Sequence, residues 1–154
     1  MFISLFQYVY FLLCVVCVSS ELEAEVQWLW SNRNSASEEV QLATTGKIKK
    51  YRRLTGEGDA YGQYLLGMCY FWGWGGVTQD HKRAAELHTL SAEQGNAWGQ
   101  VQLGDYYLHG LGVTQNRDLA RQWLRRSADQ GFQFAKAYLK QEFPHDPNEA
   151  SGPN

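Results

Sequence analysis

The chain has 154 residues, a formal net charge of -2 at pH 7 and a sequence pI near 6.1. This near-neutral balance gives no case for nucleic acid or an anionic membrane surface as a partner. The length suits one domain of ordinary size. Aromatic residues make up 14% of the chain, so a core or a binding face must accommodate many large rings.

Residues 2–18 (FISLFQYVYFLLCVVCV) form an uncharged, apolar stretch that ends before Ser19 and Ser20. Small residues after an apolar run are typical of a secretory signal peptide, which we place at residues 1–20. No Lys or Arg precedes the run, and about 17 apolar residues is near the lower limit for spanning a bilayer. A retained membrane anchor therefore stays the alternative, and we expect a periplasmic or secreted protein in which only an uncleaved segment would contact the membrane.

The three cysteines do not form a disulfide framework. Cys14 and Cys17 lie inside the apolar stretch, so cleavage after residue 20 would leave Cys69 as the one remaining thiol. A single cysteine cannot form an internal disulfide. We therefore expect the domain to be stable through packing alone.

Residues 21–57 carry the pattern of N-terminal capping helices, which we interpret as a degenerate repeat. Residues 21–30 (ELEAEVQWLW) are expected to form a helix against the first full repeat. A second helix is expected over residues 38–54, with an interruption at residues 44–46 (TTG). Its apolar positions are spaced loosely as one face, at Val40, Leu42, Ile48, Tyr51 and Leu54.

Residues 58–94 and 95–130 share one sequence pattern with a period of about 36 residues, and the pattern begins again at Gly131. The matched positions are Gly58/Gly95, Ala60/Ala97, Gly62/Gly99, Gln63/Gln100, Leu66/Leu103, Gly67/Gly104, Tyr70/Tyr107 and Gly73/Gly110. After one additional glycine in the first copy, the tripeptide Val-Thr-Gln also matches, at residues 77–79 and 113–115. A tandem repeat of this length predicts a stacked two-helix solenoid.

Each repeat is expected to fold as helix, loop and helix. The first helix is predicted over residues 60–72 in one copy and 97–109 in the other, ended by the glycine that follows. Gly67 and Gly104 place small residues on this helix, which permits close helix approach at a cost of about 1 kcal/mol relative to alanine. The predicted N-caps are Asp59 and Asn96 for the first helices, and Asp80 and Asn116 for the second helices.

The full architecture predicted is an all-α, right-handed solenoid of antiparallel helix pairs, with two full repeats and partial repeats at the ends. Residues 131–140 are expected to form a partial repeat that acts as a C-terminal cap helix. The polar, proline-bearing residues 141–154 are expected to form a flexible tail.

Three motifs make residues 58–139 resemble the Sel-one-like (Sel1-like) repeat family, a relative of the tetratricopeptide repeats. They are Leu-Gly followed by Tyr (Leu66, Gly67 and Tyr70; Leu103, Gly104 and Tyr107), the loop Gly110, Leu111, Gly112 and Val113, and the series Ala120, Trp123, Ala128, Gln130 and Gly131. The first copy departs from the family pattern at Leu87, where Trp is frequent, and by its additional loop glycine. The resemblance implies a protein-binding scaffold that has no common catalytic residues and is often exported from bacteria.

Tyr61, Trp98 and Phe134 each stand three residues after a repeat-opening glycine. If the geometry of related repeats carries over, these rings line a concave groove, where an aromatic ladder would bind a protein or peptide. The alternative is that the rings pack on one another and complete the core. The same face is expected to include Tyr64, Phe71, Trp72, Val101, Asp105, Leu108 and His109.

Charged residues supply two weaker candidates. One basic cluster is a candidate patch for an acidic partner, although charges on an amphipathic helix usually face water; it consists of Lys47, Lys49, Lys50, Arg52 and Arg53. Asp105 and His109 are spaced i, i+4 and are expected to pair on one helix face. No nucleophile is placed beside this pair by the sequence, so no catalytic residues are predicted.

The sequence predicts neither a metal site nor a cofactor. The remaining histidines, His81, His88 and His145, lack metal-ligand spacing. The loop GWGGVTQ is not followed by Lys and Ser or Thr, so it is not a phosphate-binding loop.

The predicted function is that of an exported adaptor, which binds a partner protein or peptide in the aromatic groove without chemistry. Two alternatives come from the resemblance to small exported relatives. The first is a periplasmic immunity or inhibitor protein for a toxic enzyme. The second is a penicillin-binding hydrolase, for which this chain has no assignable nucleophile and lacks the cysteine pairs of that branch.

Overall fold

The computed structural model describes the backbone of residues 38–144 and the side chains from residue 45 onward. All regular elements within these residues are helical, which confirms the predicted all-α class. They are α3 (Glu38–Gly56), α4 (Ala60–Trp72), the 3-10 helix η1 (Trp74–Gly76), α5 (His81–Glu93), α6 (Ala97–His109), α7 (Arg117–Asp129) and α8 (Gln133–Glu142). The expected signal peptide, the expected helix over residues 21–30 and the end of the expected tail lie outside the described residues.

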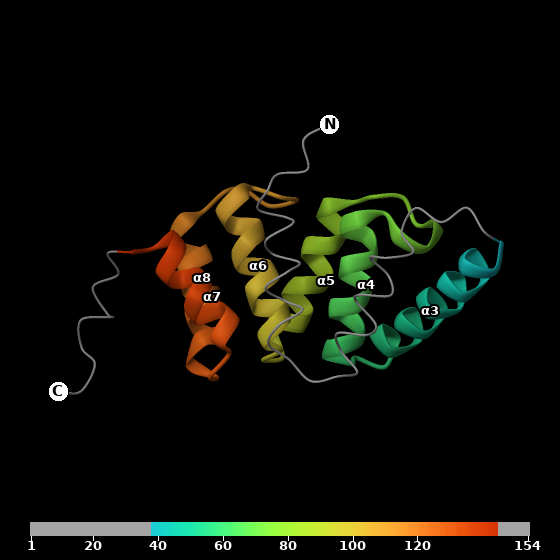
Figure 1. Ribbon diagram of the computed structural model, residues 1–154, viewed down its shortest axis with the longest axis horizontal. Coiled ribbons are helices and arrows are strands. Elements are labelled where there is room, and N and C mark those ends of the chain that lie inside the picture. Colours follow the sequence, from blue (N-terminus) through green and yellow to red (C-terminus); the bar gives the residue numbers. More distant parts are fainter. Residues whose placement is uncertain (1–37, 145–154) are drawn as a thin grey trace.

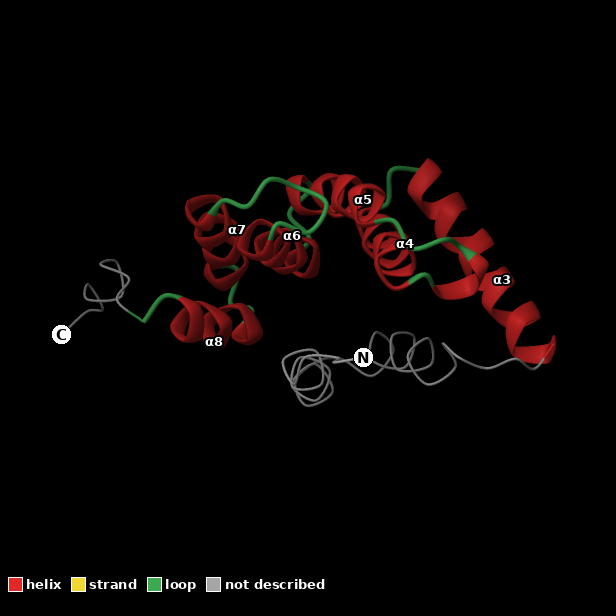
Figure 2. Cartoon of the chain, turned by 90° about the horizontal axis from the view of Figure 1, so that it is seen from above, coloured by secondary structure: helices red, strands yellow, loops and turns green. Residues whose placement is uncertain are grey.

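The helices follow one another across the molecule, from α3 at one end to α8 at the other (Figure 1). Short connections join α4 to α5 and α6 to α7 as the two helix pairs of the repeats. Seen from above, the described helices form an arc, with α5 on its outer side and α4 and α8 toward its inner side (Figure 2). No helix within residues 38–144 is both long enough and apolar enough to cross a bilayer.

The helix boundaries are set by local side-chain caps, and the predicted N-caps are confirmed. The Asp59 Oδ1 accepts a hydrogen bond from the Gly62 amide at 2.5 Å, and the Asn96 Oδ1 accepts one from the Gly99 amide at 2.9 Å. In the second helices, the Oδ1 atoms of Asp80 and Asn116 accept from the third residue of each helix. The capping residues of the two copies therefore make equivalent hydrogen bonds.

Each first helix ends at a glycine in the left-handed region, Gly73 with φ 69° and Gly110 with φ 70°. The glutamine of the shared Val-Thr-Gln tripeptide then binds back to the helix end. The Gln79 Nε2 donates to the Phe71 carbonyl at 2.8 Å, and the Gln115 Nε2 donates to the Leu108 carbonyl at 2.7 Å. These bonds explain why the tripeptide recurs, because its glutamine satisfies a carbonyl at the helix C-terminus.

The interior glycines allow the two helices of a repeat to touch, as predicted. A Cβ on Gly67 would lie 2.5 Å from the His88 Nε2, and a Cβ on Gly104 would lie 2.8 Å from the Leu124 Cγ. His88 and Leu124 occupy equivalent positions on α5 and α7, and neither has measurable exposure. Both repeats therefore require glycine at this position.

A second set of hydrogen bonds ties the two helices of each repeat together. The Ser91 Oγ donates to the Ala60 carbonyl at 2.6 Å, and its counterpart Ser127 donates to the Ala97 carbonyl at 2.9 Å. The amide groups of Gln94 and Gln130 donate to the buried side chains of Gln63 and Gln100, both at 2.7 Å. Buried polar groups must be satisfied, so these bonds account for the serine and the two glutamines that the repeats share.

Helix α3 occupies the place of a second helix in a preceding repeat. A Cβ on Gly62 would lie 2.4 Å from the Leu54 Cβ, as a Cβ on Gly99 would lie 2.6 Å from the Ser91 Oγ. The expected interruption at residues 44–46 is wrong, because α3 runs unbroken from Glu38 to Gly56. One glycine costs a helix only about 1 kcal/mol, and the packing of Ile48 and Tyr51 against α4 outweighs it.

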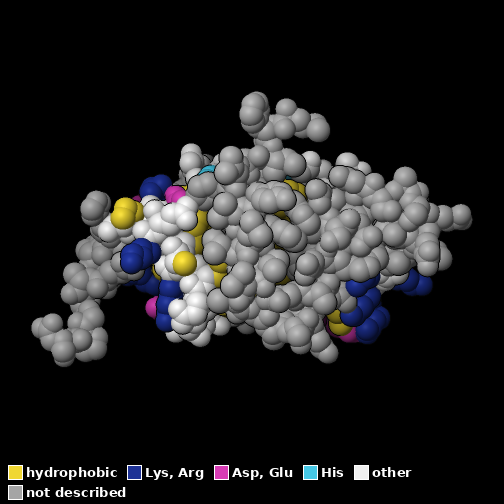
Figure 3. Space-filling model, viewed as in Figure 1, with side chains coloured by type: hydrophobic (Ala, Val, Ile, Leu, Met, Phe, Trp, Pro, Cys, Tyr) yellow, Lys and Arg dark blue, Asp and Glu magenta, His cyan; other side chains and the backbone are white. Residues whose placement is uncertain are grey.

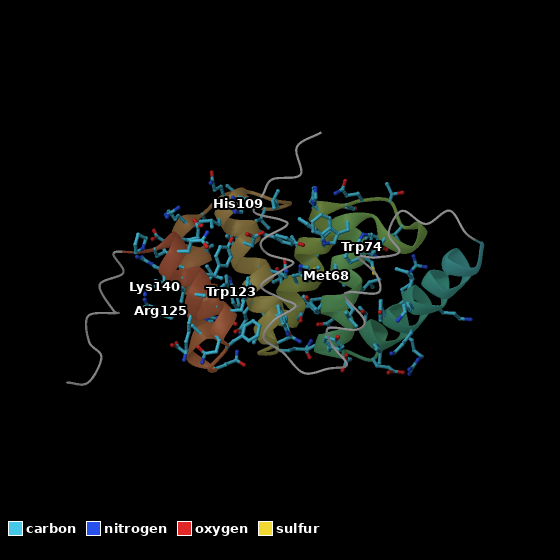
Figure 4. All side chains as sticks on the ribbon, viewed as in Figure 1. Met68, Trp74, His109, Trp123, Arg125 and Lys140 are labelled. Atoms are coloured by element: carbon cyan, nitrogen blue, oxygen red, sulfur yellow. The ribbon has the colours of Figure 1, made fainter. Side chains whose placement is uncertain are left out.

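The additional glycine of the first repeat accompanies a short 3-10 helix, η1, within which Gly75 has φ 70°. The turn inserts Trp74 into the core formed by α3 and α4, where the side chain is 3% exposed (Figure 4). Trp72 stacks on it at a centroid separation of 5.7 Å. In the second copy the smaller Leu111 is only half-buried and packs against the preceding repeat.

Helix α8 is the first helix of a third repeat and ends the described array. Lys136 stands where the full repeats have Gln63 and Gln100, and Lys140 stands where they have Gly67 and Gly104. Both lysines are exposed, and Lys140 lies at the outer end of the helices (Figure 4). The face that would contact a further helix is therefore polar, as expected for a terminal repeat. The helix continues to Glu142, two residues past the expected end of the cap helix at residue 140.

Candidate functional site

Five aromatic side chains form a continuous series across α4, α6 and α8, here called the aromatic row. Neighbouring rings have centroid separations of 6.0, 6.2, 6.2 and 6.0 Å, and the first three pairs have interplanar angles of 25°, 28° and 28°. Aromatic pairs at such separations add to the energy of simple area burial. In order along the row, the residues are Tyr61, Tyr64, Trp98, Phe134 and Tyr138.

The structure thus brings together Tyr61, Trp98 and Phe134, the three rings that follow the repeat-opening glycines. Tyr64 fills the interval between the first two, because it stands one helical turn after Tyr61 on α4. Each repeat contributes one ring from the same position, and stacking of the repeats aligns them. The row is therefore a direct product of the repeat period.

Phe132 extends the row and was missed in the sequence. Its ring meets Trp98 edge-on, with a centroid separation of 4.6 Å and an interplanar angle of 71°. It stands at the N-cap of α8, where the full repeats have Asp59 and Asn96, and it makes no side-chain cap hydrogen bond. An apolar residue at an N-cap costs about 1 kcal/mol, so this departure from the repeat pattern was a signal that the ring has another role.

The row combines buried and accessible rings. Tyr64 is 3% exposed and Tyr138 is 4% exposed, whereas Tyr61, Trp98 and Phe134 are half-buried. The rings of the row pack on one another, and three of them keep accessible surface, so their use as a binding groove stays a prediction. Packed but accessible aromatics are suited to binding, since their rotamer entropy is already restricted.

Three residues expected on the groove face, Phe71, Val101 and Leu108, belong to the core. Phe71 is 7% exposed and stacks on Tyr106 at 5.3 Å, between the two repeats. Val101 has no measurable exposure and packs in a cluster with residues of α7 and α8, which also holds the buried Leu108. These placements correct the expectation that Phe71, Val101 and Leu108 line an open surface: they lie on the flank of the helix that meets the neighbouring repeat. Trp72 is half-buried against Trp74.

A polar group adjoins the Tyr138 end of the row. Asp105 is the acceptor of a short hydrogen bond from the Tyr138 hydroxyl, and its Oδ1 lies 3.4 Å from the His109 Nε2. The i, i+4 pairing of Asp105 with His109 was predicted, whereas Tyr138 was missed because it is 33 residues away in sequence. The hydrogen bond to Asp105 raises the pKa of His109, and burial together with the Asp105 charge raises the pKa of Tyr138. His109 itself is 47% exposed at the end of α6 (Figure 4).

The basic cluster lies on α3, on the helix that precedes Tyr61. Figure 3 shows Lys and Arg side chains gathered at the end of the molecule formed by this helix. All are exposed except Lys47, which is half-buried. Arg53 pairs with Glu57 at 2.7 Å, with side-chain exposures of 63% and 54%, and such a surface pair adds little stability. The cluster consists of Lys47, Lys49, Lys50, Arg52 and Arg53.

The buried side chains of His88 and Cys69 have a structural role. The His88 Nε2 lies 3.1 Å from the Tyr64 carbonyl and donates to it, and burial lowers the pKa of His88 to about 4, so the ring is neutral at pH 7. Burial raises the pKa of the Cys69 thiol to about 12, which keeps it protonated and unreactive. Within residues 38–144, no three His, Cys, Asp or Glu side chains are grouped so as to hold a metal ion.

Comparison with known proteins finds a match to one repeat family. Residues 60–96 and 99–132 match the family model of the Sel1 repeat. The human protein sel-1 homolog 2 is 33% identical over 85 residues, which are 55% of this chain and 12% of the human protein.

Two crystal structures are similar to the helical array. One is a protective antigen present in uropathogenic Escherichia coli strains and displaying an SLR fold, with a TM-score of 0.58 and 37% identity over 61% of this chain and 20% of the antigen. The other is a Sel1 repeat protein from Oxalobacter formigenes, with a TM-score of 0.57 and 38% identity over 59% of this chain and 26% of that protein. The chain thus spans about a quarter or less of the length of these relatives.

Proposed function

We propose that this chain, whose residues 60–96 and 99–132 match the Sel1 repeat model, is a non-catalytic adaptor of the Sel1-like repeat family that binds a partner protein or peptide with its aromatic row. Sel1 repeat proteins generally mediate protein–protein interactions. Such proteins use the surface of stacked repeats for recognition. The aromatic row is the feature of this chain that fits the role.

The observation that carries the proposal is the position of Trp98. It stands at the centre of the row, 6.2 Å from both Tyr64 and Phe134, and it is only half-buried. A few aromatic residues supply most of the energy of many interfaces, and truncation of such a residue costs about 2 kcal/mol or more. Loss of the Trp98 ring should therefore weaken partner binding about 30-fold.

The proposed partner is a protein segment with apolar side chains. Rings about 6 Å apart can accept successive turns of an amphipathic helix, whose anchors recur at about 5.4 Å along its axis. The basic cluster on α3 lies next to the Tyr61 end and would favour acidic residues beyond that end of the bound segment. The apolar stretch at residues 2–18 supports a place for this adaptor outside the cytoplasm.

Affinity capture with matched variants tests the proposal. Wild-type protein is compared with a Tyr61→Ala, Trp98→Ala, Phe134→Ala triple variant, whose helical circular dichroism is checked first. Leu90→Ala is the control, because Leu90 is 48% exposed and lies on the outer helix α5. We expect one protein to be captured by the wild type and the Leu90 variant and lost from the triple variant. Equal capture by a folded triple variant would move the site away from the row.

A further inference from the structure

We propose that Asp105 is a positioning residue for the aromatic row, because its hydrogen bond with Tyr138 fixes where helix α8 lies along α6. Through α8, this bond sets the rings of Phe132 and Phe134 against Trp98. The consequence for partner binding rests on the function proposed above. The position of α8 is a separate property that can be measured without a partner.

Helix α8 depends on tertiary contacts for its position. It has ten residues, and helices shorter than about 12 residues are marginal in isolation. Its N-cap residue, Phe132, makes no side-chain cap hydrogen bond. In the part of the chain that the structure describes, no helix follows α8, and exposed Lys136 and Lys140 occupy the face that a following helix would cover. The helix is therefore held from one side.

Ring contacts near the start of α6 and a hydrogen bond near its end join α8 to α6. Trp98 stacks on Phe134 with a centroid separation of 6.2 Å. The hydroxyl group of the buried Tyr138 donates a short hydrogen bond to the Asp105 Oδ1. Asp105 follows Trp98 by seven residues, which is about 10 Å along the helix axis. Contacts at two heights restrict both the sliding and the rotation of α8 against α6.

The hydrogen bond restricts α8 more strictly than the ring contacts do. Apolar packing is non-directional, so stacked rings tolerate a small slide of one helix along the other. A bond between a hydroxyl and a carboxylate needs a separation of about 2.5–2.7 Å, and a slide by one residue moves a helix by about 1.5 Å. The His109 Nε2 lies 3.4 Å from the same Asp105 oxygen and helps to orient the carboxylate.

Both partners of the bond depart from the repeat pattern. Asp105 stands where the first repeat has Met68, and Tyr138 stands where the second repeat has Gln102. A thioether is only a weak acceptor, so the preceding junction of repeats cannot form an equivalent bond. The charge-assisted hydrogen bond thus occurs at the junction with α8, the last helix that the structure describes.

Hydrogen exchange in the full chain tests the positioning. Tyr138→Phe removes only the hydroxyl group, and Tyr107→Phe is the matched control, because it makes the same change at a half-buried ring. We expect amide exchange in α8 to become about tenfold faster in Tyr138→Phe, since a hydrogen bond to a charged acceptor is lost, while exchange in α4 and α5 matches the wild type. Equal acceleration in all helices, or none in α8, would overturn the proposal.

Nuclear Overhauser effects between the ring protons of Trp98 and Phe134 report on the stack itself. They should weaken in Tyr138→Phe and in Asp105→Ala. Asp105→Asn should retain part of them, because its side-chain oxygen can still accept the bond. A contribution to stability alone would leave these effects at wild-type strength in the folded protein, and that result would contradict the proposal.

The affinity for the captured partner separates this inference from the proposed function. Tyr138→Phe should bind the partner more weakly than Tyr107→Phe does. Partner binding that requires Trp98 but not the Tyr138 hydroxyl would refute this inference alone. A displaced α8 in Tyr138→Phe, with no protein captured by the wild type, would refute the proposed function alone.

Discussion

Gly67 is the position at which one added methyl group should do the most damage to the first repeat. A Cβ there would lie 2.5 Å from the His88 Nε2 and 2.6 Å from its Cδ2. The His88 ring cannot give way easily, because it is fully buried and donates to the Tyr64 carbonyl at 3.1 Å. The Gly67→Ala substitution therefore displaces a packed ring and breaks its hydrogen bond.

The expected loss follows from three contributions. Overpacking a dense core costs about 1–3 kcal/mol, and an unsatisfied buried polar group costs about 1–3 kcal/mol. Replacing an interior helical glycine by alanine returns about 1 kcal/mol. The net free energy of unfolding of Gly67→Ala should fall by about 3 kcal/mol, a large part of the 5–15 kcal/mol typical of a domain.

Urea unfolding followed by circular dichroism at pH 7 measures this loss. Gly46→Ala is the matched control, because a Cβ at Gly46 has no atom within 4 Å and should stabilise α3 by about 0.5–1 kcal/mol. Adding His88→Ala to Gly67→Ala should recover part of the loss by removing the clash. A Gly67→Ala protein as stable as the wild type would refute the assigned helix contact and the repeat register with it.

Further substitutions test separate parts of the account. Wild-type stability should fall by about 3 kcal/mol as the pH drops from 6.5 to about 4, because His88 binds a proton in the unfolded chain but stays neutral in the folded one. His88→Leu introduces the residue of the second repeat and should remove this pH dependence. An unchanged slope of stability against pH between these values would contradict the prediction. A double-mutant cycle of Phe132→Ala with Trp98→Ala should give a coupling energy of about 0.5–1.5 kcal/mol by urea unfolding, and zero coupling would contradict the edge-on contact. Asp105→Asn should lower the pKa of His109 toward 6.5 in an NMR titration, because the carboxylate stabilises the protonated imidazole. In the wild type, the contribution of the His109–Asp105 interaction to stability is present below pH 6.5 and is lost as the pH rises through the raised pKa of His109. An unchanged pKa of His109 would show that it does not interact with Asp105.

The helix boundaries could be predicted because their causes are local. Asp59 and Asn96 each cap a helix within three residues, and Gly73 and Gly110 adopt the left-handed conformation that ends it. The repeat period then places each boundary twice. The continuous α3 could not be predicted, because a local helix breaker, Gly46, is overcome by packing of the flanking residues against another helix.

The candidate site was only partly readable from the sequence for a related reason. The period brings Tyr61, Trp98 and Phe134 into one row, so their alignment follows from the pattern. Which flank of each helix meets the next repeat depends on how the helices are rotated, and this rotation buries Phe71 and Val101. Contacts such as that of Tyr138 with Asp105 join residues of different repeats at unmatched positions, so the repeat pattern contains no sign of them.

The most direct measurement of the central claim is the affinity of the captured partner for Trp98→Ala, determined by isothermal titration calorimetry beside the free energy of unfolding of the same variant. The half-buried ring predicts a modest loss of stability, about 1–2 kcal/mol, and partner binding weakened about 30-fold. Leu90→Ala should match the wild type in both measurements. A Trp98→Ala protein that is destabilised but binds with wild-type affinity would show that the row belongs to the core and that the partner binds elsewhere.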